Sequence, residues 1–428
     1  MQQFIEEKLM TPVKGEYDVI VAGGGPAGIC AALSAARGGM KVLLVERFSC
    51  LGGMWTSGLV NPLFDYENKG GIVREIVNII NSADMNDHSG PMYTFDIEYM
   101  KLVLDRLLRD AGVKVLFHTA FAAPLLSRDN DIYGITVENK GGRSAYLGKR
   151  VIDCTGDGDV AARAGAPFRL GRESDGACQP MTLMFTISHM DYIQRANNPY
   201  STHTDLYHVM CDGLAAAGVK DYSFNFENPW LLKLPGLHRG VLQMTHMRGY
   251  DPLDPEQLSL AEAEGRERVW EALGFFRRYC PEFKNAQIEQ TAAMIGVRES
   301  RRIIGEYELT LDDITEGRKF RDGIATCCFG VDIHEPDGKA QTVGIISRPY
   351  QIPYRCLVPK NVGNLLTAGR CISGSHEAHA SYRVTGDCAA MGQAAGTAAA
   401  MSIIQNVSPR ELDGAEVAEK MVAAGARV

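Results

Sequence analysis

The chain has 428 residues, more than one compact core usually holds, so its length favours two domains. Its net charge of −8 and its pI of about 5.7 argue against nucleic acid or an acidic membrane surface as the main partner. The sequence has no apolar run long enough for a transmembrane helix, and the N-terminal MQQFIEEKLM is unlike a signal peptide. We therefore expect a cytoplasmic protein without a nucleic-acid or membrane partner.

The eleven cysteines are scattered along the chain and form no C-x-x-C motif. The only close pair, Cys327 and Cys328, is adjacent in sequence. This pattern argues against an iron–sulfur cluster, a structural zinc site or a redox dithiol. We expect buried thiols in a reducing compartment, and no bound metal.

The stretch 17–47, YDVIVAGGGPAGICAALSAARGGMKVLLVER, predicts a strand, a glycine turn, a helix and a second strand that ends in an acid. The glycines of its G-x-G-x-x-G motif allow a tight turn, close approach of a diphosphate and close helix–strand packing. Glu46 lies 18 positions after the last of these glycines, where an acid accepts both hydroxyls of an adenosine ribose. The stretch predicts a dinucleotide site, for FAD or for NAD, whose diphosphate lies at the helix start. The predicted contacts there are Gly23, Gly25, Pro26, Ala27 and Gly28.

A glycine-rich loop, FSCLGGMWTSG, follows this unit. An NAD-binding unit does not need such a loop, whereas a flavoprotein must thread the rest of the flavin past the diphosphate. In that interpretation Gly53 marks the loop, and Met54 and Trp55 pack near the isoalloxazine ring. The alternative is a surface loop with one anchored tryptophan.

Several further elements follow from periodicity and from turn residues. Residues 190–240 mix Asn, Pro, Tyr and Trp, as a loop-rich substrate domain would. We predict helices over 72–80, 96–111 and 255–279, strands over 113–117, 132–137 and 181–187, a β hairpin or meander over 125–139, and an extended segment over 351–359.

The second motif, KRVIDCTGDGDVA at 149–161, also matches G-x-G-x-x-A. The residues after it supply no strand that ends in a suitably spaced acid, so we reject a second dinucleotide site. We expect instead a strand that returns to the first sheet and brings Thr155 and Gly156 close to the first nucleotide.

Three arginines, Arg298, Arg301 and Arg302, crowd a short segment of the predicted substrate domain. They either pair with neighbouring glutamates, namely Glu299, Glu306 and Glu308, or one of them faces an anionic substrate. The sequence leaves both interpretations open.

The third motif lies at 364–401 and combines a strand, a turn at Gly369 and a helix made almost entirely of small residues. Such a helix packs closely on a sheet and can point its N-terminus at a polar group of the cofactor. An NAD dehydrogenase has no obvious use for it, whereas it can stabilise negative charge on a reduced flavin. This motif favours FAD.

The three motifs, VIVAGGGPAG…KVLLVER…GG, VIDCTGDGD and NLLTAGR…GQAAG, resemble those of FAD-dependent oxidoreductases of the glutathione-reductase-like superfamily. A broad bacterial FAD-dependent oxidoreductase family is similar in three further segments, GVRESRRIIGEYELT, YQIPYRCLVP and AGRCIS. The resemblance implies an α/β fold with a Rossmann-like FAD-binding domain in three layers, a parallel sheet plus a β meander, and an inserted α+β substrate domain. The implied boundaries are 1–170 and 351–428 for the FAD-binding domain and 171–350 for the substrate domain.

The resemblance also implies positions along the cofactor. Glu46 would hold the ribose, Arg47 would lie near the adenine, and Phe121 would pass the adenine with its backbone. The diphosphate and flavin ends would be approached by Thr155, Gly156, Asp159, Gly369 and Arg370. A distant similarity to fumarate reductase and succinate dehydrogenase flavoproteins places Arg383 where those enzymes bind a substrate carboxylate, although Arg370 replaces their usual acid. Cysteine-rich cluster motifs, as in relatives similar to the heterodisulfide reductase flavoprotein, are missing from this sequence.

For catalysis we expect His376 as a base and Arg383 as an anion or oxyanion partner, with Tyr354 and Arg355 nearby. His376 and His379 form a His-x-x-His motif, but a metal site there lacks a third ligand nearby. The alternative to a catalytic role is that these histidines only hold the loop by hydrogen bonds. The expected function is oxidation or reduction of a small molecule by hydride transfer with flavin N5, using non-covalent FAD and an unidentified electron acceptor or donor. A flavin-dependent isomerase or lyase, and an electron-transfer or sensor flavoprotein, remain alternatives.

Overall fold

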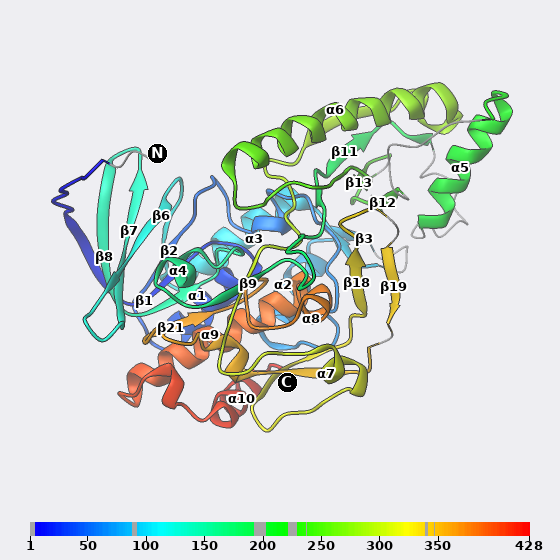
Figure 1. Ribbon diagram of the computed structural model, residues 1–428. Helices are drawn as coiled ribbons and strands as arrows, with labels where there is room; N and C mark the ends of the chain where they lie inside the picture. Colours follow the sequence, from blue (N-terminus) through cyan, green and yellow to red (C-terminus); the bar gives the residue numbers. More distant parts are fainter. Residues whose placement is uncertain are drawn as a thin grey trace.

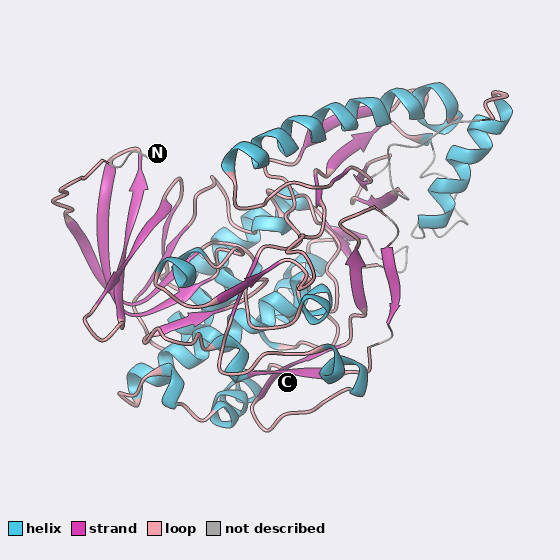
Figure 2. Ribbon diagram, viewed as in Figure 1, coloured by secondary structure: helices cyan, strands magenta, loops and turns pink. Residues whose placement is uncertain are grey.

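A parallel sheet runs through the middle of the fold (Figures 1 and 2). The computed structural model describes residues 5–87, 92–191, 203–220, 229–236, 238–338, 341–345 and 347–428, and the side chains of 203–205 and 341–344 lie outside the description. The parallel strands are, in spatial order, β5 (Lys114–Leu116), β2 (Val42–Val45), β1 (Val13–Ala22), β8 (Gly142–Asp153) and β21 (Leu365–Thr367). The return of the chain to the first sheet, predicted for the second motif, is confirmed by the pairing of β8 with β1.

The first half of β8 also pairs antiparallel with β7 (Ile132–Asn139), which pairs with β6 (Ala120–Leu126). These strands form the meander at the left of Figure 1. Alternate residues of the parallel strands face opposite cores, as the period of two requires. In β1, Val19 and Val21 face the helices, whereas Ile20 and Ala22 face the meander side.

The helical layer is built around α1 (Pro26–Arg37) and α9 (Thr385–Ile404). Their backbones touch, because a Cβ at Gly392 would lie 2.0 Å from the carbonyl oxygen of Ala27, and one at Gly396 would lie 2.2 Å from that of Ala31. Next to them lie α3 (Ile97–Asp110), capped by the Asp96 carboxylate on the Tyr99 amide, and α2 (Gly71–Ser82). The predicted three-layer α/β fold with a parallel sheet and a meander is confirmed.

A second, antiparallel sheet lies towards the upper right of Figure 1, beside the long helix α6 (Pro255–Tyr279). Its strand order is β12 (Trp230–Lys233), β13 (Gly240–Gln243), β11 (Phe185–Ser188) and β15 (Gln287–Thr291). The structure corrects the loop-rich expectation for 190–240, because 203–216 form helix α5 and 230–233 form β12. Leu206, Met210 and Leu214 are buried at four-residue spacing on α5, so the helical period was present in the sequence.

Short elements connect the two regions. The paired strands are β10 (Met181–Thr182) with β14 (His246–Met247), β9 (Phe168–Leu170) with β16 (Arg301–Ile303), β17 (Gly323–Cys327) with β20 (Tyr350–Pro353), β18 (Val331–His334) with β19 (Gln341–Ile345), and β3 (Asn86–Asp87) with β4 (Thr94–Phe95). The short helices are α4 (Asp159–Arg163), α7 (Leu311–Glu316), α8 (His376–Tyr382) and α10 (Gly414–Ala423), with 3₁₀ helices at Gly53–Trp55, Pro281–Phe283, Tyr354–Leu357 and Pro409–Glu411. The predicted extended segment 351–359 therefore ends at Pro353, where a 3₁₀ turn begins. Among the described helices, none combines the length and the apolar character that a bilayer span requires.

Candidate active site

The three sequence motifs meet at the carboxyl ends of β1, β8 and β21. Gly23 follows β1 with φ of +98°, and a Cβ there would lie 2.4 Å from the carbonyl oxygen of Cys154, just after β8. Gly369 follows β21, and its Cβ would lie 3.1 Å from that of Ala27 on α1. Ligands of open α/β sheets bind at this edge.

The start of α1 is an anion site with room in front of it. Gly25 is the N-cap residue and has no side chain to cap the helix, and Pro26 follows, so the amides of Ala27 and Gly28 have no acceptor within the helix. A Cβ at Gly25 would meet nothing within 4 Å, whereas one at Gly28 would lie 1.8 Å from the carbonyl oxygen of Gly23. Gly25 therefore leaves space for a diphosphate, and Gly28 makes the close turn against Gly23 possible.

Glu46, predicted to bind the adenosine ribose, lies at the end of β2 beside the glycine turn. Its buried carboxylate accepts hydrogen bonds from the amides of Gly24 (2.6 Å) and Phe48 (2.9 Å). The segment before β6 runs alongside, since the Thr119 amide donates to the carbonyl of Glu46 (2.9 Å). Phe121 begins the meander just beyond it, which is the arrangement expected for an adenine passing between the two segments. The exposed Arg47 side chain lies over the Phe48 ring, 4.9 Å from its centroid.

The polar side chains of the second motif bind one another. The fully buried Asp153 carboxylate accepts from the Thr155 hydroxyl (2.7 Å) and from the amides of Thr155 (3.1 Å) and Ala161 (2.8 Å). Burial raises the pKa of Asp153 to about 6 despite these bonds. The Asp159 carboxylate pairs with Arg301 (2.9 Å). The structure therefore leaves the backbone around Gly156, rather than the side chains of Thr155 and Asp159, for a cofactor.

Arg370 takes a role that the sequence did not reveal. Its guanidinium donates to Asp157 (2.7 Å) and to the Ser300 hydroxyl (2.9 Å), and Ser300 donates to the same Asp157 oxygen (2.6 Å). Burial alone would raise the pKa of Asp157, but the charge of Arg370 together with the hydrogen bonds from Ser300 and Arg370 lowers that pKa. The sequence TGDGD offers two aspartates, and the one that meets Arg370 is Asp157.

The segment 298–302, RESRR, crosses from β10 and β14 to the strand ends and presents each side chain to a different neighbour. Glu299 is fully buried and accepts hydrogen bonds from Arg302, from His376 Nδ1 (2.8 Å) and from the amide of Gln179 (3.1 Å). His376 is the first residue of α8, which is capped by the Ser375 side chain. Because Nδ1 faces a carboxylate, it carries the proton, and Nε2 is left as the acceptor.

Two further side chains of α8 point towards this centre. His379 is fully buried, and neither of its ring nitrogens has a hydrogen-bond partner among the described residues. Burial, followed by the charge of Arg302, lowers its pKa, so the ring is neutral. Arg383 ends the helix and donates to the carbonyl of Asp332 (2.9 Å). His376, His379 and Arg383 thus lie at helical spacing along α8 and its C-cap.

Three expected residues lie elsewhere. The Tyr354 hydroxyl donates to the carbonyl of Pro409 (2.7 Å), and Arg355 pairs with Asp322 (2.8 Å). The structure therefore does not bring these two side chains to His376. Trp55 packs edge-on against Phe95 in the core instead of facing the groove. The Met54 side chain lies between Gly58 and Gly296, and its packing near the isoalloxazine ring stays a prediction.

The fit to a flavin nucleotide rests on this chain's own groups. Open space in front of Gly25, free amides at the start of α1 and buried polar atoms without partners lie around the same strand ends. Among the described residues, the partnerless atoms include both ring nitrogens of His379 and the hydroxyl of Thr385, the first residue of α9. A dinucleotide with its diphosphate at the start of α1 would fill the open space at Gly25 and accept hydrogen bonds from the free amides there.

A buried cluster of charged side chains at the start of α9 already contains a cation, the ammonium group of Lys69. Asp65, Asp387 and Cys327 lie within reach of one another, but the Lys69 ammonium lies 2.8 Å from Asp65 and 2.6 Å from Asp387. Burial alone would lower the pKa of Lys69, yet the neighbouring groups together, Asp387 first and then Cys327 and Asp65, raise it. The lysine thus occupies the position that a metal ion would need.

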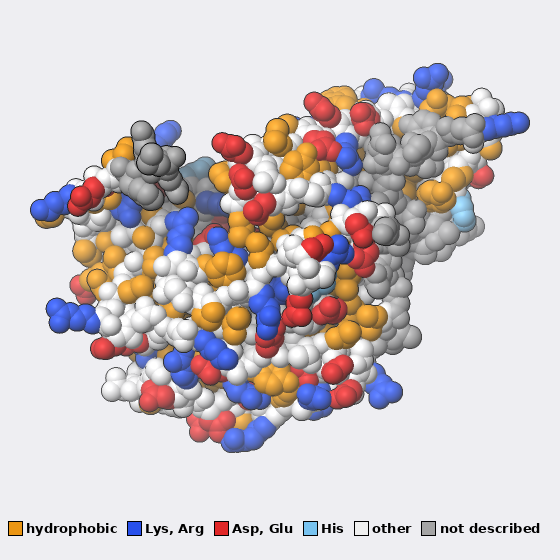
Figure 3. Space-filling model, in the orientation of Figure 1, with side chains coloured by type: hydrophobic (Ala, Val, Ile, Leu, Met, Phe, Trp, Pro, Cys, Tyr) orange, Lys and Arg blue, Asp and Glu red, His pale blue; other side chains and the backbone are white. Residues whose placement is uncertain are grey.

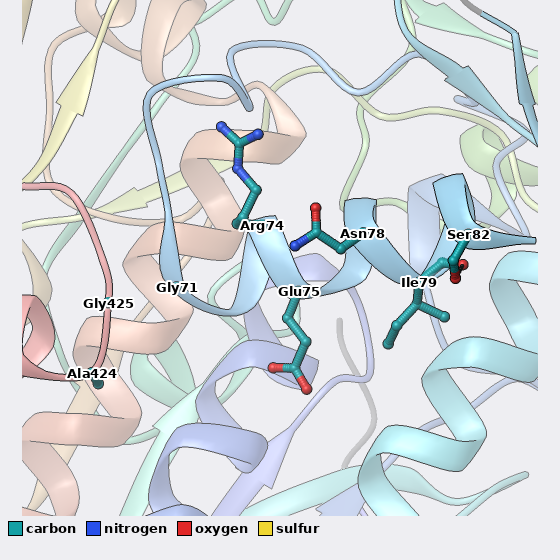
Figure 4. Close-up of a pocket in the computed structure, with 8 residues that line it drawn as sticks. All are labelled: Gly71, Arg74, Glu75, Asn78, Ile79, Ser82, Ala424 and Gly425. Carbon is teal, nitrogen blue, oxygen red and sulfur yellow. Dashed lines mark hydrogen bonds between the residues drawn. The ribbon is translucent and has the colours of Figure 1, made fainter.

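A shallow depression of about 590 Å³ lies apart from the strand ends, between α2 and the turn after α10 (Figure 4). Figure 4 shows Arg74 and Glu75 pointing in different directions along α2. Its surroundings carry no group that could position a substrate against the strand ends. Its lining consists of Gly71, Arg74, Glu75, Asn78, Ile79, Ser82, Ala424 and Gly425.

Known proteins match part of the chain in sequence. The chain is 30% identical over 150 residues to the thiamine thiazole synthase of Methanothermobacter thermautotrophicus and 30% identical over 158 residues to that of Pyrococcus abyssi. These alignments cover 33% and 35% of this chain and span 56% and 60% of those relatives.

Solved structures are matched over most of the chain. A geranylgeranyl bacteriochlorophyll reductase-like protein from Thermoplasma acidophilum is 14% identical, with a TM-score of 0.47, over 95% of this chain and 83% of that one. The myxobacterial FAD-dependent chondrochloren halogenase CndH is 13% identical, also with a TM-score of 0.47, over 95% of this chain and 78% of that one. The sequence model of the FAD dependent oxidoreductase family matches residues 18–421. The chain therefore belongs to the FAD dependent oxidoreductase family, and its cofactor is FAD.

Proposed function

We propose that this flavoenzyme oxidises or reduces a small molecule by hydride transfer to or from flavin N5, with FAD held without a covalent bond. The observation that supports it best is the chain of contacts from Arg302 through Glu299 to His376, next to the strand ends that bind the cofactor. A buried carboxylate that orients a histidine is the arrangement that a general base needs.

The chemistry divides between cofactor and protein. When bound, FAD takes up or supplies the hydride. For oxidation, His376 Nε2 accepts the proton of the substrate O–H or N–H group whose carbon gives up the hydride, and for reduction the same nitrogen returns it. Glu299 keeps Nδ1 protonated and stabilises the imidazolium, and the ion pair with Arg302 holds Glu299 in place. Arg383 approaches from the same helix as an anion or oxyanion partner.

We assign the substrate side to residues 171–350 and the FAD-binding side to residues 1–170 and 351–428. The strands of the large sheet come from 13–153 and 365–367, whereas those of the antiparallel sheet come from 185–291, which supports these boundaries. The electron acceptor or donor is a separate small molecule or protein, and the proposed compartment is the cytoplasm.

The cofactor and the redox role can be tested together. The absorbance spectrum of the purified protein should show a flavin, and acid precipitation should leave it in the supernatant. An anaerobic screen of small molecules should then find one that bleaches the flavin, and steady-state turnover should consume an added electron acceptor. A flavin that stays in the pellet would contradict non-covalent binding, and turnover of a bleaching substrate without net electron transfer would contradict the redox role.

The base is tested with His376→Ala. The rate constant of flavin reduction by the identified substrate should fall by about 10²–10⁴-fold, because that is the usual contribution of a positioned acid–base group. The FAD content should not change. His208→Ala is the matched control, since His208 is an exposed histidine on α5. Unchanged reduction kinetics in the His376 variant would remove this residue from the mechanism.

A further inference from the structure

Of the three arginines in segment 298–302, only Arg298 lacks a carboxylate partner among the described residues. Arg301 pairs with Asp159 and Arg302 with Glu299. Arg298 instead donates to three neutral acceptors, the carbonyl of Pro180 (2.8 Å), the Thr182 hydroxyl (2.6 Å) and His246 Nε2 (3.0 Å). These bonds use both Nη1 hydrogens and one on Nη2, so the Nε–H and the second Nη2 hydrogen remain for a ligand.

Arg383 adds a second guanidinium to the same place. Its firm bond goes to the backbone carbonyl of Asp332 (2.9 Å), while its contacts with the Asp332 carboxylate and with Gln179 are both 3.4 Å long. Its buried Nε has no acceptor among the described residues. Burial, followed by the positive charge of Arg383, lowers the pKa of Arg298 to about 9. Two guanidinium groups therefore share one loosely placed carboxylate, and a positive charge is left over.

The neighbouring histidines do not neutralise this charge. His246 accepts from Arg298 at Nε2, and burial, followed by the charge of Arg298, lowers its pKa, so its ring is neutral. Its ring stacks on that of His334, with centroids 5.1 Å apart and planes at 23°. Burial likewise lowers the pKa of His334 to about 4. The two rings are buried against each other and add no charge beside the arginines.

One residue connects this cluster to the proposed base. The amide of Gln179 donates to Glu299 (3.1 Å), which orients His376, and its side-chain oxygen accepts from the amide of His334 (3.2 Å). Arg298 and Glu299 are also neighbours in the chain. An anion held by the arginines would thus anchor a molecule whose other end reaches towards His376.

Building on the proposed function, we infer that Arg298 and Arg383 form a subsite for a carboxylate group, so that the substrate is a small carboxylic acid. Two guanidinium groups and the carboxylate of Asp332 leave one net positive charge, which matches a carboxylate monoanion better than a phosphate dianion. Arg248 is another cation near Arg298. The negative charge of Asp337 acts on Arg248, so Arg248 is not counted in this balance.

The test uses the FAD-loaded enzyme at constant ionic strength, with acetate, acetamide and inorganic phosphate as probes. Acetate should perturb the flavin absorbance and raise the melting temperature in a saturable way, because it binds only the folded state. Acetamide has nearly the same shape without the charge and should do neither. Phosphate should bind more weakly than acetate, and phosphate binding more tightly would overturn the carboxylate assignment.

Two variants and one control localise the effect. Arg298→Gln should weaken acetate binding at least about tenfold, since it removes a charged hydrogen-bond donor. Arg298→Lys keeps the charge but loses the planar fork, so it should lie between wild type and Arg298→Gln and serves if the glutamine variant does not fold. Arg278→Gln changes an exposed arginine on α6 and should match wild type.

The outcomes separate this inference from the proposed function. A holoenzyme whose flavin is reducible but which responds to none of the probes would overturn the subsite and leave the redox role intact. Equal acetate binding in wild type and both Arg298 variants would do the same. A protein that takes up no FAD would instead contradict the redox role itself.

Discussion

Replacing Gly25 by alanine should separate cofactor binding from folding. Gly25 has φ of −74° and ψ of −175°, which alanine adopts without strain, and its new Cβ would meet no protein atom within 4 Å. In the cofactor-free protein the substitution should therefore be neutral or stabilise the fold by about 0.4–1 kcal/mol, because alanine restricts the unfolded chain. The same methyl group would project into the space that the diphosphate needs.

The loss of affinity can be estimated from the cost of overfilling a packed site. One extra methyl group in a close contact costs about 1–3 kcal/mol. At about 1.4 kcal/mol per factor of ten, the dissociation constant for FAD should rise by about 5- to 150-fold. The free energy of unfolding of the apoprotein should not fall.

Quenching of FAD fluorescence on titration with apoprotein measures the dissociation constant, and urea unfolding measures stability. Gly274→Ala is the matched control, because a Cβ at Gly274 would also meet nothing within 4 Å, but this residue lies on α6. That variant should bind FAD like wild type and gain helix propensity. FAD binding by the Gly25 variant as tight as that of wild type would refute the placement of the diphosphate at this glycine.

Three other substitutions test the buried charges. Lys69→Met leaves Asp65 and Asp387 facing each other without a cation, so urea unfolding should show a loss of about 3–5 kcal/mol, which Lys69→Met combined with Asp387→Asn should partly restore. Burial raises the pKa of Asp153 to about 6, above the ordinary value of about 3.9. The native state therefore holds this proton more tightly than the unfolded state does. The contribution of Asp153 to stability falls as the pH rises from about 4 to about 6. Asp153→Asn removes that titration, and the free energy of unfolding of the variant relative to wild type should shift in the variant's favour by about 2 kcal/mol between pH 4 and pH 7, while no shift would refute the raised pKa. Glu46→Gln loses one of the two carboxylate bonds to the loop amides and should raise the dissociation constant for FAD by about 10- to 100-fold in the same fluorescence titration, with unchanged affinity as the contrary result.

The strand, glycine turn, helix and second strand of the first motif could be predicted because their signals are local. Glycines at fixed spacing, a helix start and an acid at the end of the next strand lie within one short stretch, and each has a physical role there. The helix at Pro255–Tyr279 could be predicted for the same reason, since its aspartate cap and apolar spacing are neighbours in sequence.

The substrate half depends on contacts that no local pattern encodes. Glu299 and His376 are 77 positions apart, and Arg298 and His246 are 52 apart. The sequence showed three crowded arginines, but which of them would find carboxylates was decided by distant strands. We predicted that Tyr354 lies near the catalytic base because of its position in a motif. In the structure its hydroxyl donates to the backbone carbonyl of Pro409.

Surface charge gives no comparable guidance to a partner. On the face of the molecule seen in Figure 3, acidic and basic side chains are interspersed among apolar and neutral ones. The arginines of the proposed carboxylate subsite are instead held by Gln179, Thr182 and Asp332.

The close contact between α1 and α9 sets an order of events during synthesis. A ribosome makes the glycine turn and α1 first, but the glycines that let α9 lie on α1, Gly392 and Gly396, come more than 350 residues later. Strand β21, which completes the parallel sheet, is also late. The nascent chain therefore carries an unfinished nucleotide site for most of translation, and the cofactor can be captured firmly only after α9 has emerged from the exit tunnel.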